Sequence, residues 1–356
     1  MKAWEMNVRR TVPYVPGEQP QAVNLVKLNT NENPYPPAPG VAKVLRETDA
    51  DLLRRYPDPA AGALVRAIAD FHGVAPEQVF VGVGSDDVLG MAFLTFFAGE
   101  KPILFPDITY SFYDVWADLF RIPYRRPALD ENFRLRPEDY LQENGGIVIA
   151  NPNAPTSIAE PLEVIERIAA GNPGSVVIVD EAYVDFGGQT ALPLTAKYDN
   201  VLVVRTFSKS RSLAGLRIGY AIGCEALIRA LQDIKYSYNS YTMNAVTIAA
   251  GCASVEDRAY FEETLAKVVA TRETAEKKLR ELGFTFPESS TNFLFATHET
   301  VPADYIFAEL RRRQIYVRYF PKPRIDRFLR ITVGTPEEMD RLCEALGEII
   351  SAYRPG

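Results

Sequence analysis

The stretch from Val201 to Tyr220 decides the fold, and it reads Val-Leu-Val-Val-Arg-Thr-Phe-Ser-Lys-Ser-Arg-Ser-Leu-Ala-Gly-Leu-Arg-Ile-Gly-Tyr. It opens with the apolar, β-branched run Val201–Val204, which is typical of a buried parallel strand. Hydroxyl and cationic side chains follow this run at once, and a second short strand is predicted over Arg217–Ile222, after Gly215. The stretch therefore predicts a buried strand with a polar segment directly beyond its end.

Lys209 lies in this polar segment, with Thr206 and Ser208 before it and Arg217 after it. One interpretation is a basic surface turn after a strand, which the segment taken alone favours. The other is an amine that forms a Schiff base with an aldehyde cofactor, whose phosphate is held by the neighbouring hydroxyl and cationic groups. Other segments of the chain have to decide between the two.

Short apolar runs alternate with helical patterns along much of the chain. The predicted strands are Phe80–Val81, Pro102–Phe105, Ile147–Ala150, Val176–Val179 and Val201–Val204, and the predicted helices include Tyr110–Phe120 and Leu162–Ala170. This alternation is typical of an α/β fold, in which helices cover both faces of a mostly parallel sheet.

A polar motif follows each of these predicted strands. The motifs are Gly84–Asp86, Asp107–Tyr110, Asn151–Ser157, Asp180–Tyr183 and Thr206–Lys209. In open parallel sheets ligands bind beyond the carboxyl ends of the strands, so the motifs should meet at one edge. We therefore expect a single site there.

The length of 356 residues suits one large domain and one smaller one. Prolines are frequent in residues 1–40, which predicts an extended N-terminal arm. A large domain is predicted over residues 41–242 and a small C-terminal α+β domain over residues 243–356, with the boundary near Met243. Within the small domain, residues 255–282 are predicted to form one long helix.

Composition argues against several classes of protein. The net charge of −7 argues against a nucleic-acid binder. Two histidines and three widely spaced cysteines argue against a metal site or a disulfide framework and favour a reducing compartment. No signal peptide is recognised and no apolar run is long enough to cross a membrane, so no membrane association and a cytoplasmic location are expected.

Asp180 follows a buried apolar run, where a carboxylate is costly unless it is paired. It either accepts hydrogen bonds from the next turn or pairs with the protonated ring nitrogen of a cofactor. Tyr183 is close enough in sequence to reach a neighbouring ring oxygen. Tyr110 either provides a flat face for the ring or packs in the core.

A glycine turn between a strand and a helix precedes Ser85 and Asp86. This arrangement either receives an anion at the helix N-terminus, together with Arg217, or is an ordinary capped turn. Arg330 is a lone cation in an apolar strand, either paired in the interior or a clamp for a carboxylate. Asn29 begins a run of amide side chains that forms either a turn or a loop at the site.

Several segments carry a resemblance to a known family. The chain resembles the fold-type I, pyridoxal-phosphate-dependent aminotransferases over essentially its whole length, and is most similar to the histidinol-phosphate aminotransferase family. The matching segments are Pro13–Gly17, Leu28–Pro34, Arg55–Pro57, Gly82–Asp87, Asp180–Tyr183, Ser208–Lys209, Leu213–Tyr220 and Arg330–Thr335.

The resemblance implies a role for each candidate residue. Lys209 is the expected Schiff-base lysine, Asp180 the partner of the pyridine nitrogen, Tyr183 a hydrogen-bond partner of the ring hydroxyl, and Tyr110 the residue stacked on the ring. The implied ligands of the cofactor phosphate are Ser85, Asp86, Thr206, Ser208, Arg217 and, from the second subunit of a homodimer, Tyr56. The implied substrate-binding residues are Arg330 for the carboxylate of glutamate or 2-oxoglutarate, Tyr14 and Arg318 near the phosphate of histidinol phosphate, and Asn29.

The chain departs from the family at one position. The family usually reads Asn-Pro-Asn-Asn-Pro-Thr-Gly where this chain has Asn-Pro-Asn-Ala-Pro-Thr-Ser over residues 151–157, so Ala154 replaces the asparagine that bonds the ring hydroxyl. The lost hydrogen bond is worth about 0.5–1.5 kcal/mol. Tyr183 is then expected to act alone or with water. Arg211 also makes the lysine segment more cationic than usual.

The expected activity is amino transfer between histidinol phosphate and 2-oxoglutarate in histidine biosynthesis. An aromatic amino-acid aminotransferase and a threonine-phosphate decarboxylase share the scaffold and remain alternatives. A non-enzymatic ligand sensor built on this domain is the alternative from another class. Such sensors carry a winged helix before the domain, and the match here already starts by Pro13, which disfavours it.

Overall fold

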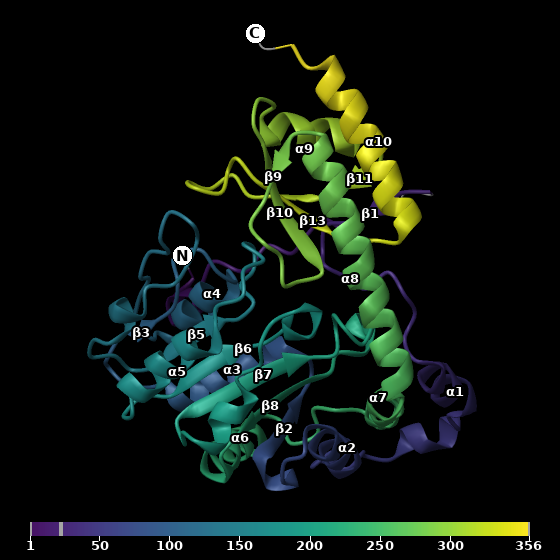
Figure 1. Cartoon of the computed structure of the whole chain (residues 1–356). Coiled ribbons are helices and arrows are strands. Elements are labelled where there is room, and N and C mark those ends of the chain that lie inside the picture. The colour runs from purple at the N-terminus through teal and green to yellow at the C-terminus, as the bar shows by residue number, and fades with distance from the viewer. Residues whose placement is uncertain (1, 21–23, 355–356) are drawn as a thin grey trace.

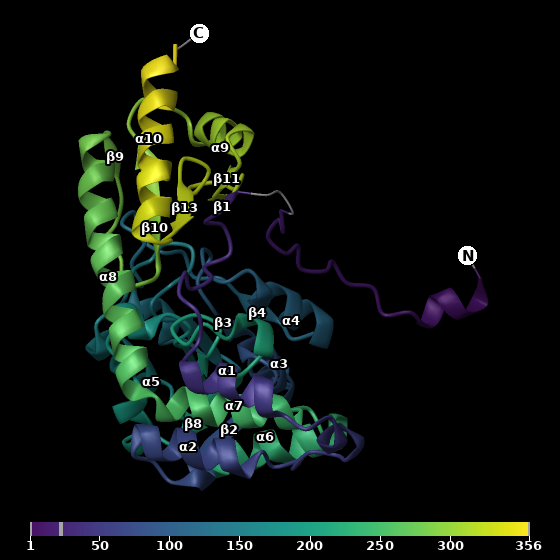
Figure 2. The same ribbon diagram turned by 90° about the vertical axis from the view of Figure 1, so that its right-hand side faces the viewer.

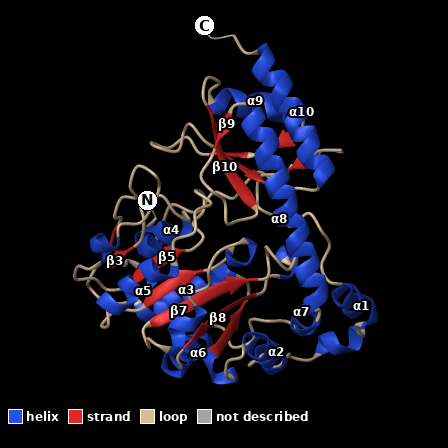
Figure 3. Cartoon of the chain, viewed as in Figure 1, coloured by secondary structure: helices blue, strands red, loops and turns tan. Residues whose placement is uncertain are grey.

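The computed structural model describes residues 2–20 and 24–354. Two units are arranged one above the other and are joined by a long helix (Figures 1 and 3). The larger unit contains a seven-stranded sheet in the order β2-β8-β7-β6-β5-β3-β4. Its strands are β2 (Val79–Gly82), β3 (Ile103–Leu104), β4 (Tyr124–Arg125), β5 (Ile147–Ala150), β6 (Val177–Asp180), β7 (Val201–Thr206) and β8 (Gly219–Gly223).

The expected mostly parallel sheet is confirmed. Five adjacent strands run parallel to one another, in the order β4, β3, β5, β6 and β7. The next strand, β8, is antiparallel to both of its neighbours, β7 and β2. Asp180 pairs in register with Ala150 on one side and Val204 on the other, so the ends of three strands lie together. The strand expected from Arg217 begins only at Gly219, because Arg217 has a left-handed backbone with φ of 53°.

Helices cover both faces of this sheet, as the alternation predicts. One face carries α3 (Ser85–Phe96), α4 (Phe112–Phe120) and α6 (Glu225–Tyr238), and the other carries α1 (Pro39–Glu47), α2 (Gly62–His72), α5 (Leu162–Gly171) and α7 (Ala245–Glu256). Because side chains alternate along a strand, Leu202 and Val204 pack on the first face and Val201 and Val203 on the second.

The smaller unit is an α+β layer. Its antiparallel sheet has the order β12-β13-β10-β9, and a separate parallel pair joins β1 to β11. The strands are β1 (Val26–Lys27), β9 (Phe284–Thr285), β10 (Phe293–His298), β11 (Ile315–Tyr316), β12 (Arg318–Tyr319) and β13 (Leu329–Thr332). Helices α8 (Arg258–Glu281), α9 (Ala303–Arg312) and α10 (Pro336–Ala352) share one apolar core with these strands.

The prediction of one helix over residues 255–282 is wrong at its start. Residues 255 and 256 are the end of α7, and α8 begins only at Arg258. Asp257 ends α7 with non-helical backbone angles, and its carboxylate accepts a hydrogen bond from the Tyr260 N–H, which caps α8. Helix α7 packs against α1 and α2 in the larger unit, as Figure 2 also shows. The domain boundary predicted from the sequence lies before this helix, near Met243. Met243 itself is buried in that same cluster.

The N-terminal segment is only partly an extended arm. A short 3₁₀ helix near the N-terminus stands away from the body in Figure 2, whereas β1 joins the smaller unit and Pro39 already begins α1. The 3₁₀ helices of the chain are η1 (Ala3–Asn7), η2 (Ala50–Arg54), η3 (Pro76–Gln78), η4 (Pro137–Tyr140), η5 (Val184–Phe186), η6 (Leu192–Ala196) and η7 (Ala214–Leu216). Among the described residues, no helix combines the length and apolarity needed to cross a membrane.

Candidate active site

A pocket of about 1300 Å³ opens beyond the carboxyl ends of the parallel strands, between the two units. All five predicted motifs contribute to its wall, which confirms that they meet at one edge of the sheet. The predicted site residues that line it are Tyr14, Asn29, Ser85, Asp86, Tyr110, Asp180, Tyr183, Thr206, Ser208, Lys209, Arg217, Arg318 and Arg330. The pocket also includes Ala154, whose methyl group offers no hydrogen bond.

Lys209 projects into this pocket directly after β7. Its Nζ atom donates a hydrogen bond to the Thr30 carbonyl oxygen at 3.2 Å and lies 5.7 Å from the centre of the Tyr183 ring. The backbone of Lys209 is held from the same N-terminal segment, because Asn33 Nδ2 donates to its carbonyl oxygen at 3.0 Å. The amine is therefore positioned by residues far away in sequence, which excludes the surface-turn interpretation.

Asp180 lies at the end of β6 and is only 5% exposed. Its Oδ2 atom accepts a hydrogen bond from the Tyr113 hydroxyl at 2.8 Å, and its Oδ1 atom accepts one from the Ala182 N–H at 3.2 Å. Burial raises the pKa of Asp180 to about 6 in spite of these bonds. An acid held in this way gains from a cationic partner, such as a protonated ring nitrogen in the pocket.

The turn before α3 forms a cradle around the Arg217 guanidinium. Gly84 has a φ of 87°, and a Cβ atom there would lie 2.4 Å from Arg217 Nη2. Arg217 Nη1 donates to Ser208 Oγ at 3.3 Å, and Arg217 Nη2 lies 3.6 Å from an oxygen of Asp86. Only glycine allows the guanidinium this close to the helix N-terminus, so cation and helix dipole act on one spot. The arrangement fits a phosphate group.

Tyr110 and Tyr183 both line the pocket and have different hydrogen-bond partners. The Tyr110 hydroxyl donates to Asp86 Oδ1 at 2.9 Å, and burial raises the pKa of Tyr110 well above its usual value. The Tyr183 hydroxyl accepts a hydrogen bond from Asn31 Nδ2 at 2.9 Å. The sequence predicted neither this contact nor the one between Tyr113 and Asp180.

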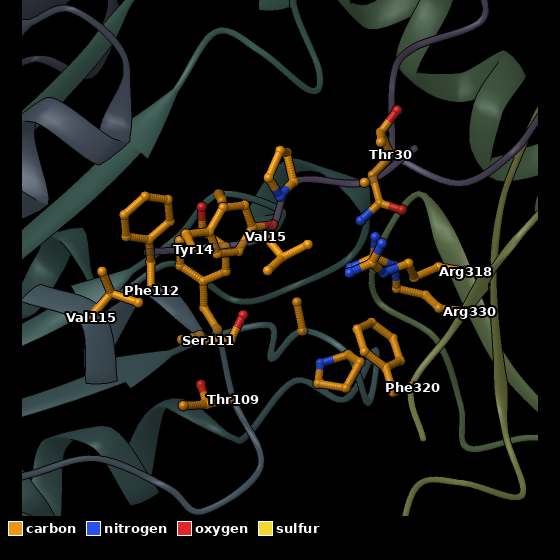
Figure 4. A pocket seen from close by; sticks show the side chains of 18 of the residues that line it. Tyr14, Val15, Thr30, Thr109, Ser111, Phe112, Val115, Arg318, Phe320 and Arg330 are labelled. Atoms are coloured by element: carbon orange, nitrogen blue, oxygen red, sulfur yellow. The ribbon is translucent and has the colours of Figure 1, made fainter. Parts of the chain in front are cut away.

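The smaller unit contributes two arginines to the pocket. Arg318 on β12 and Arg330 on β13 are register partners, and Figure 4 shows their side chains next to each other. Arg330 Nη2 donates to the Asn29 carbonyl oxygen at 3.0 Å, while its buried Nε atom has no hydrogen-bond partner. No carboxylate of the described residues forms a salt bridge with Arg330. This favours the carboxylate clamp over the buried ion pair.

Tyr14 lies across the pocket from these arginines. Its ring stacks on Phe112 with 4.5 Å between the ring centres, and Figure 4 shows both on the same side of the pocket. Tyr14 belongs to the N-terminal segment, so the arm also reaches the site.

Two residues named from the sequence lie outside this pocket. Tyr56 is 81% exposed and packs on Tyr241, with 4.6 Å between the ring centres. Arg211 is buried away from the site, and its guanidinium lies 4.2 Å from the centre of the Phe261 ring. Its Nη1 atom donates to the Ser254 carbonyl oxygen at 2.7 Å, so Arg211 fastens the lysine segment to α7. No group of acidic, histidine or cysteine side chains in the described ranges could hold a metal ion.

Known proteins share both the sequence and the fold. The family described as aminotransferase class I and II matches residues 23–346. The histidinol-phosphate aminotransferase of Chromohalobacter salexigens is 54% identical over 97% of this chain and 98% of its own length. Histidinol-phosphate aminotransferase 1 of Hydrogenovibrio crunogenus is 50% identical over 98% of each chain.

Two solved structures of aminotransferases share the fold of this chain. Histidinol-phosphate aminotransferase of Sinorhizobium meliloti, in complex with pyridoxal-5′-phosphate, superposes with a TM-score of 0.84 at 26% identity, covering 92% of this chain and 91% of its own. Aspartate aminotransferase of Thermus thermophilus shares the fold at 20% identity, with a TM-score of 0.81 and coverage of 92% of each chain. This chain belongs to the histidinol-phosphate aminotransferase family, within the class I and II aminotransferases.

Proposed function

We propose that this protein moves an amino group between histidinol phosphate and 2-oxoglutarate in histidine biosynthesis, with pyridoxal 5′-phosphate as its cofactor. The observation that carries the proposal is the pair Arg318 and Arg330. They lie side by side on the neighbouring strands β12 and β13 and line the same pocket as Lys209. Guanidinium groups bind phosphates and carboxylates through paired N–H donors. The phosphate of histidinol phosphate and the carboxylates of 2-oxoglutarate both suit this wall.

The residues of the pocket fit pyridoxal 5′-phosphate. When bound, the cofactor supplies an aldehyde that receives the amino group and a ring that withdraws electrons from the substrate. The buried carboxylate of Asp180 would keep a proton on the ring nitrogen, and that cationic partner would compensate for the cost of burying the acid. The groups that would bind the phosphate are those around the Gly84 turn: Ser85, Thr206, Ser208, Arg217 and Asp86, the last through its backbone N–H at the start of α3.

Lys209 is the proposed acid and base for the proton at the substrate α-carbon. Its Nζ atom would hold the cofactor through its aldehyde carbon, and the freed amine would carry a proton to and from the substrate α-carbon. Tyr183 would donate a hydrogen bond to the ring hydroxyl, and Tyr110 would provide a flat face for the ring. Arg330 orients the substrate carboxylate, with its guanidinium held by the Asn29 carbonyl, and Tyr14 and Arg318 bind at the phosphate end.

The protein is expected to act as a homodimer in the cytoplasm. Tyr56 is exposed next to other exposed apolar side chains, Leu52 and Leu53, which is consistent with a covered surface in a dimer. In that dimer Tyr56 would reach the cofactor phosphate of the other subunit. The three cysteines are free in the structure, which is consistent with a reducing compartment.

The experiment that tests this activity compares Arg318→Ala with the parent protein on several amino donors. Its kcat/KM on histidinol phosphate should fall by about 10- to 100-fold, because a charge-assisted hydrogen bond is worth about 1.5–3 kcal/mol. The loss on phenylalanine should be far smaller. Arg312→Ala, at an exposed arginine outside the pocket, is the matched control.

The alternatives predict other results in the same assay. Equal losses on histidinol phosphate and phenylalanine would favour an aromatic amino-acid aminotransferase. Release of carbon dioxide from threonine phosphate would identify the decarboxylase. Binding of the cofactor without turnover of any amino donor would identify a ligand sensor.

A further inference from the structure

Asn31 is a buried side chain whose polar groups are all used. It is 1% exposed and lines the pocket, and its backbone is left-handed with a φ of 57°. Its N–H donates to Thr332 Oγ1 at 3.0 Å, its carbonyl accepts from Asn292 Nδ2 at 3.0 Å, and its Oδ1 atom accepts from Thr332 Oγ1 at 2.9 Å. Its Nδ2 atom donates to the Tyr183 hydroxyl.

These bonds fix the orientation of the Asn31 amide. Thr332 Oγ1 accepts the backbone N–H of Asn31, so its own proton is free to go to Asn31 Oδ1. If the amide were reversed, this buried hydroxyl proton would have no acceptor, which is costly. The NH₂ group therefore faces Tyr183, and the Tyr183 oxygen has to accept.

The consequence for Tyr183 concerns the direction of its own proton. Because its oxygen receives the Asn31 N–H, its hydroxyl proton points to another partner, and Tyr183 lines the pocket. We propose that Asn31 is a positioning residue that makes Tyr183 a hydrogen-bond donor to the ring hydroxyl of the bound cofactor. This inference rests on the proposed function.

Thr332 gives the arrangement a second support. It lies two residues after Arg330 on β13, so Asn31 is anchored to the strand that carries the substrate-binding arginine. The titratable groups that face Tyr183 are Lys209, Arg330 and Tyr110, with Asp180 at the start of the same segment. None of them is changed by a substitution at position 31 or 332.

The test is the pH midpoint of the near-visible absorption of the cofactor-loaded enzyme without substrate. A donor to the ring oxygen favours its ionised form, so weakening the donor raises this midpoint. Asn31→Gly removes the side chain without straining the left-handed backbone and should raise the midpoint by about 0.5–1 pH unit. Tyr183→Phe should raise it at least as much, and Thr332→Val should lie between the parent and Asn31→Gly.

Asn31→Asp is the decisive variant, because its size is almost unchanged and its polarity is reversed. An ionised carboxylate only accepts, so the Tyr183 proton turns away from the ring, and the midpoint should rise as in Tyr183→Phe. Thr332→Ser keeps the hydroxyl and should keep the parental midpoint. A parental midpoint in both Asn31→Gly and Asn31→Asp would overturn the inference while leaving the proposed function intact. Failure of the parent protein to bind the cofactor would instead overturn the proposed function.

Discussion

Tyr113 donates its hydroxyl proton to Oδ2 of Asp180 over 2.8 Å, and both side chains are buried, with Asp180 in the wall of the pocket. This bond is one of two that stabilise the charged form of Asp180, the other coming from the Ala182 N–H. Burial outweighs them and raises the pKa of the acid to about 6. Without a cationic partner, the folded protein therefore holds Asp180 at a cost.

Asp180→Asn should unfold at a higher temperature than the parent when both are free of cofactor at pH 7. The folded-state pKa of about 6 lies above the unfolded value, so the cost of the charge is absent below about pH 4, grows up to pH 6 and is complete above it. The expected gain at pH 7 is about 1–3 kcal/mol, reduced because an amide has only one acceptor oxygen for two donors.

Calorimetry at pH 7 and near pH 4 checks this prediction. The advantage of Asp180→Asn should shrink at the lower pH, where the parent acid is protonated. The same variant should bind pyridoxal 5′-phosphate more weakly and lose most of its activity. An advantage that does not change with pH would show that the charge is not its cause.

Gly84→Ala should weaken binding of the cofactor. A Cβ atom at position 84 would lie 2.4 Å from Arg217 Nη2, and the backbone at φ 87° and ψ 163° is open almost only to glycine. The guanidinium must therefore move, and the strain destabilises the protein by about 1–3 kcal/mol. Titration of cofactor-free protein with pyridoxal 5′-phosphate should show a Kd raised by about tenfold or more.

Gly174→Ala is the matched control for this substitution. Apart from Gly174 and its two chain neighbours, no heavy atom of the described residues lies within 4 Å of a Cβ atom built there, and its φ is outside the left-handed region. It should leave both the Kd and the unfolding temperature unchanged. If the two variants weaken cofactor binding equally, the contact at Gly84 has no special importance.

Arg330→Lys should raise KM for glutamate and 2-oxoglutarate more than it lowers kcat. Lysine keeps the charge but loses the planar pair of N–H donors, and the buried Nε atom of Arg330 has no hydrogen-bond partner among the described residues. The expected rise is about 10- to 100-fold, the equivalent of one charge-assisted hydrogen bond. Steady-state kinetics with each acid measures it, and an unchanged KM would contradict the clamp.

The sequence predicted the ends of these five strands to within two residues, because a polar motif closely follows each run of buried apolar residues. Local patterns determine such ends, and parallel pairing then aligns them at one edge. The contacts of Tyr113 and Asn31 were missed because they join residues far apart in sequence, which no local pattern encodes. For Tyr113, a local signal was its position three residues after Tyr110, near the start of α4.

The break at Asp257 was missed for a similar reason. Residues on both sides of it favour a helix, so the local pattern runs through without interruption. The aspartate side chain can cap a helix, and packing of α7 on α1 and α2 requires the change of direction. The sequence showed only that Arg211 makes the lysine segment more cationic, whereas in the structure its guanidinium packs on the rings of Phe71 and Phe261.

Mixed dimers should show whether Tyr56 acts across a subunit interface. Its side chain is 81% exposed and does not line the pocket of its own chain, so the role proposed for it requires a site on another copy. Tyr56→Ala and Lys209→Ala should each be nearly inactive alone. When the two chains are co-expressed, each mixed dimer contains one complete site, with Lys209 from one chain and Tyr56 from the other. Random pairing should then restore about a quarter of the parental activity. If Tyr56 served its own chain, neither site of a mixed dimer would be complete and co-expression would restore nothing.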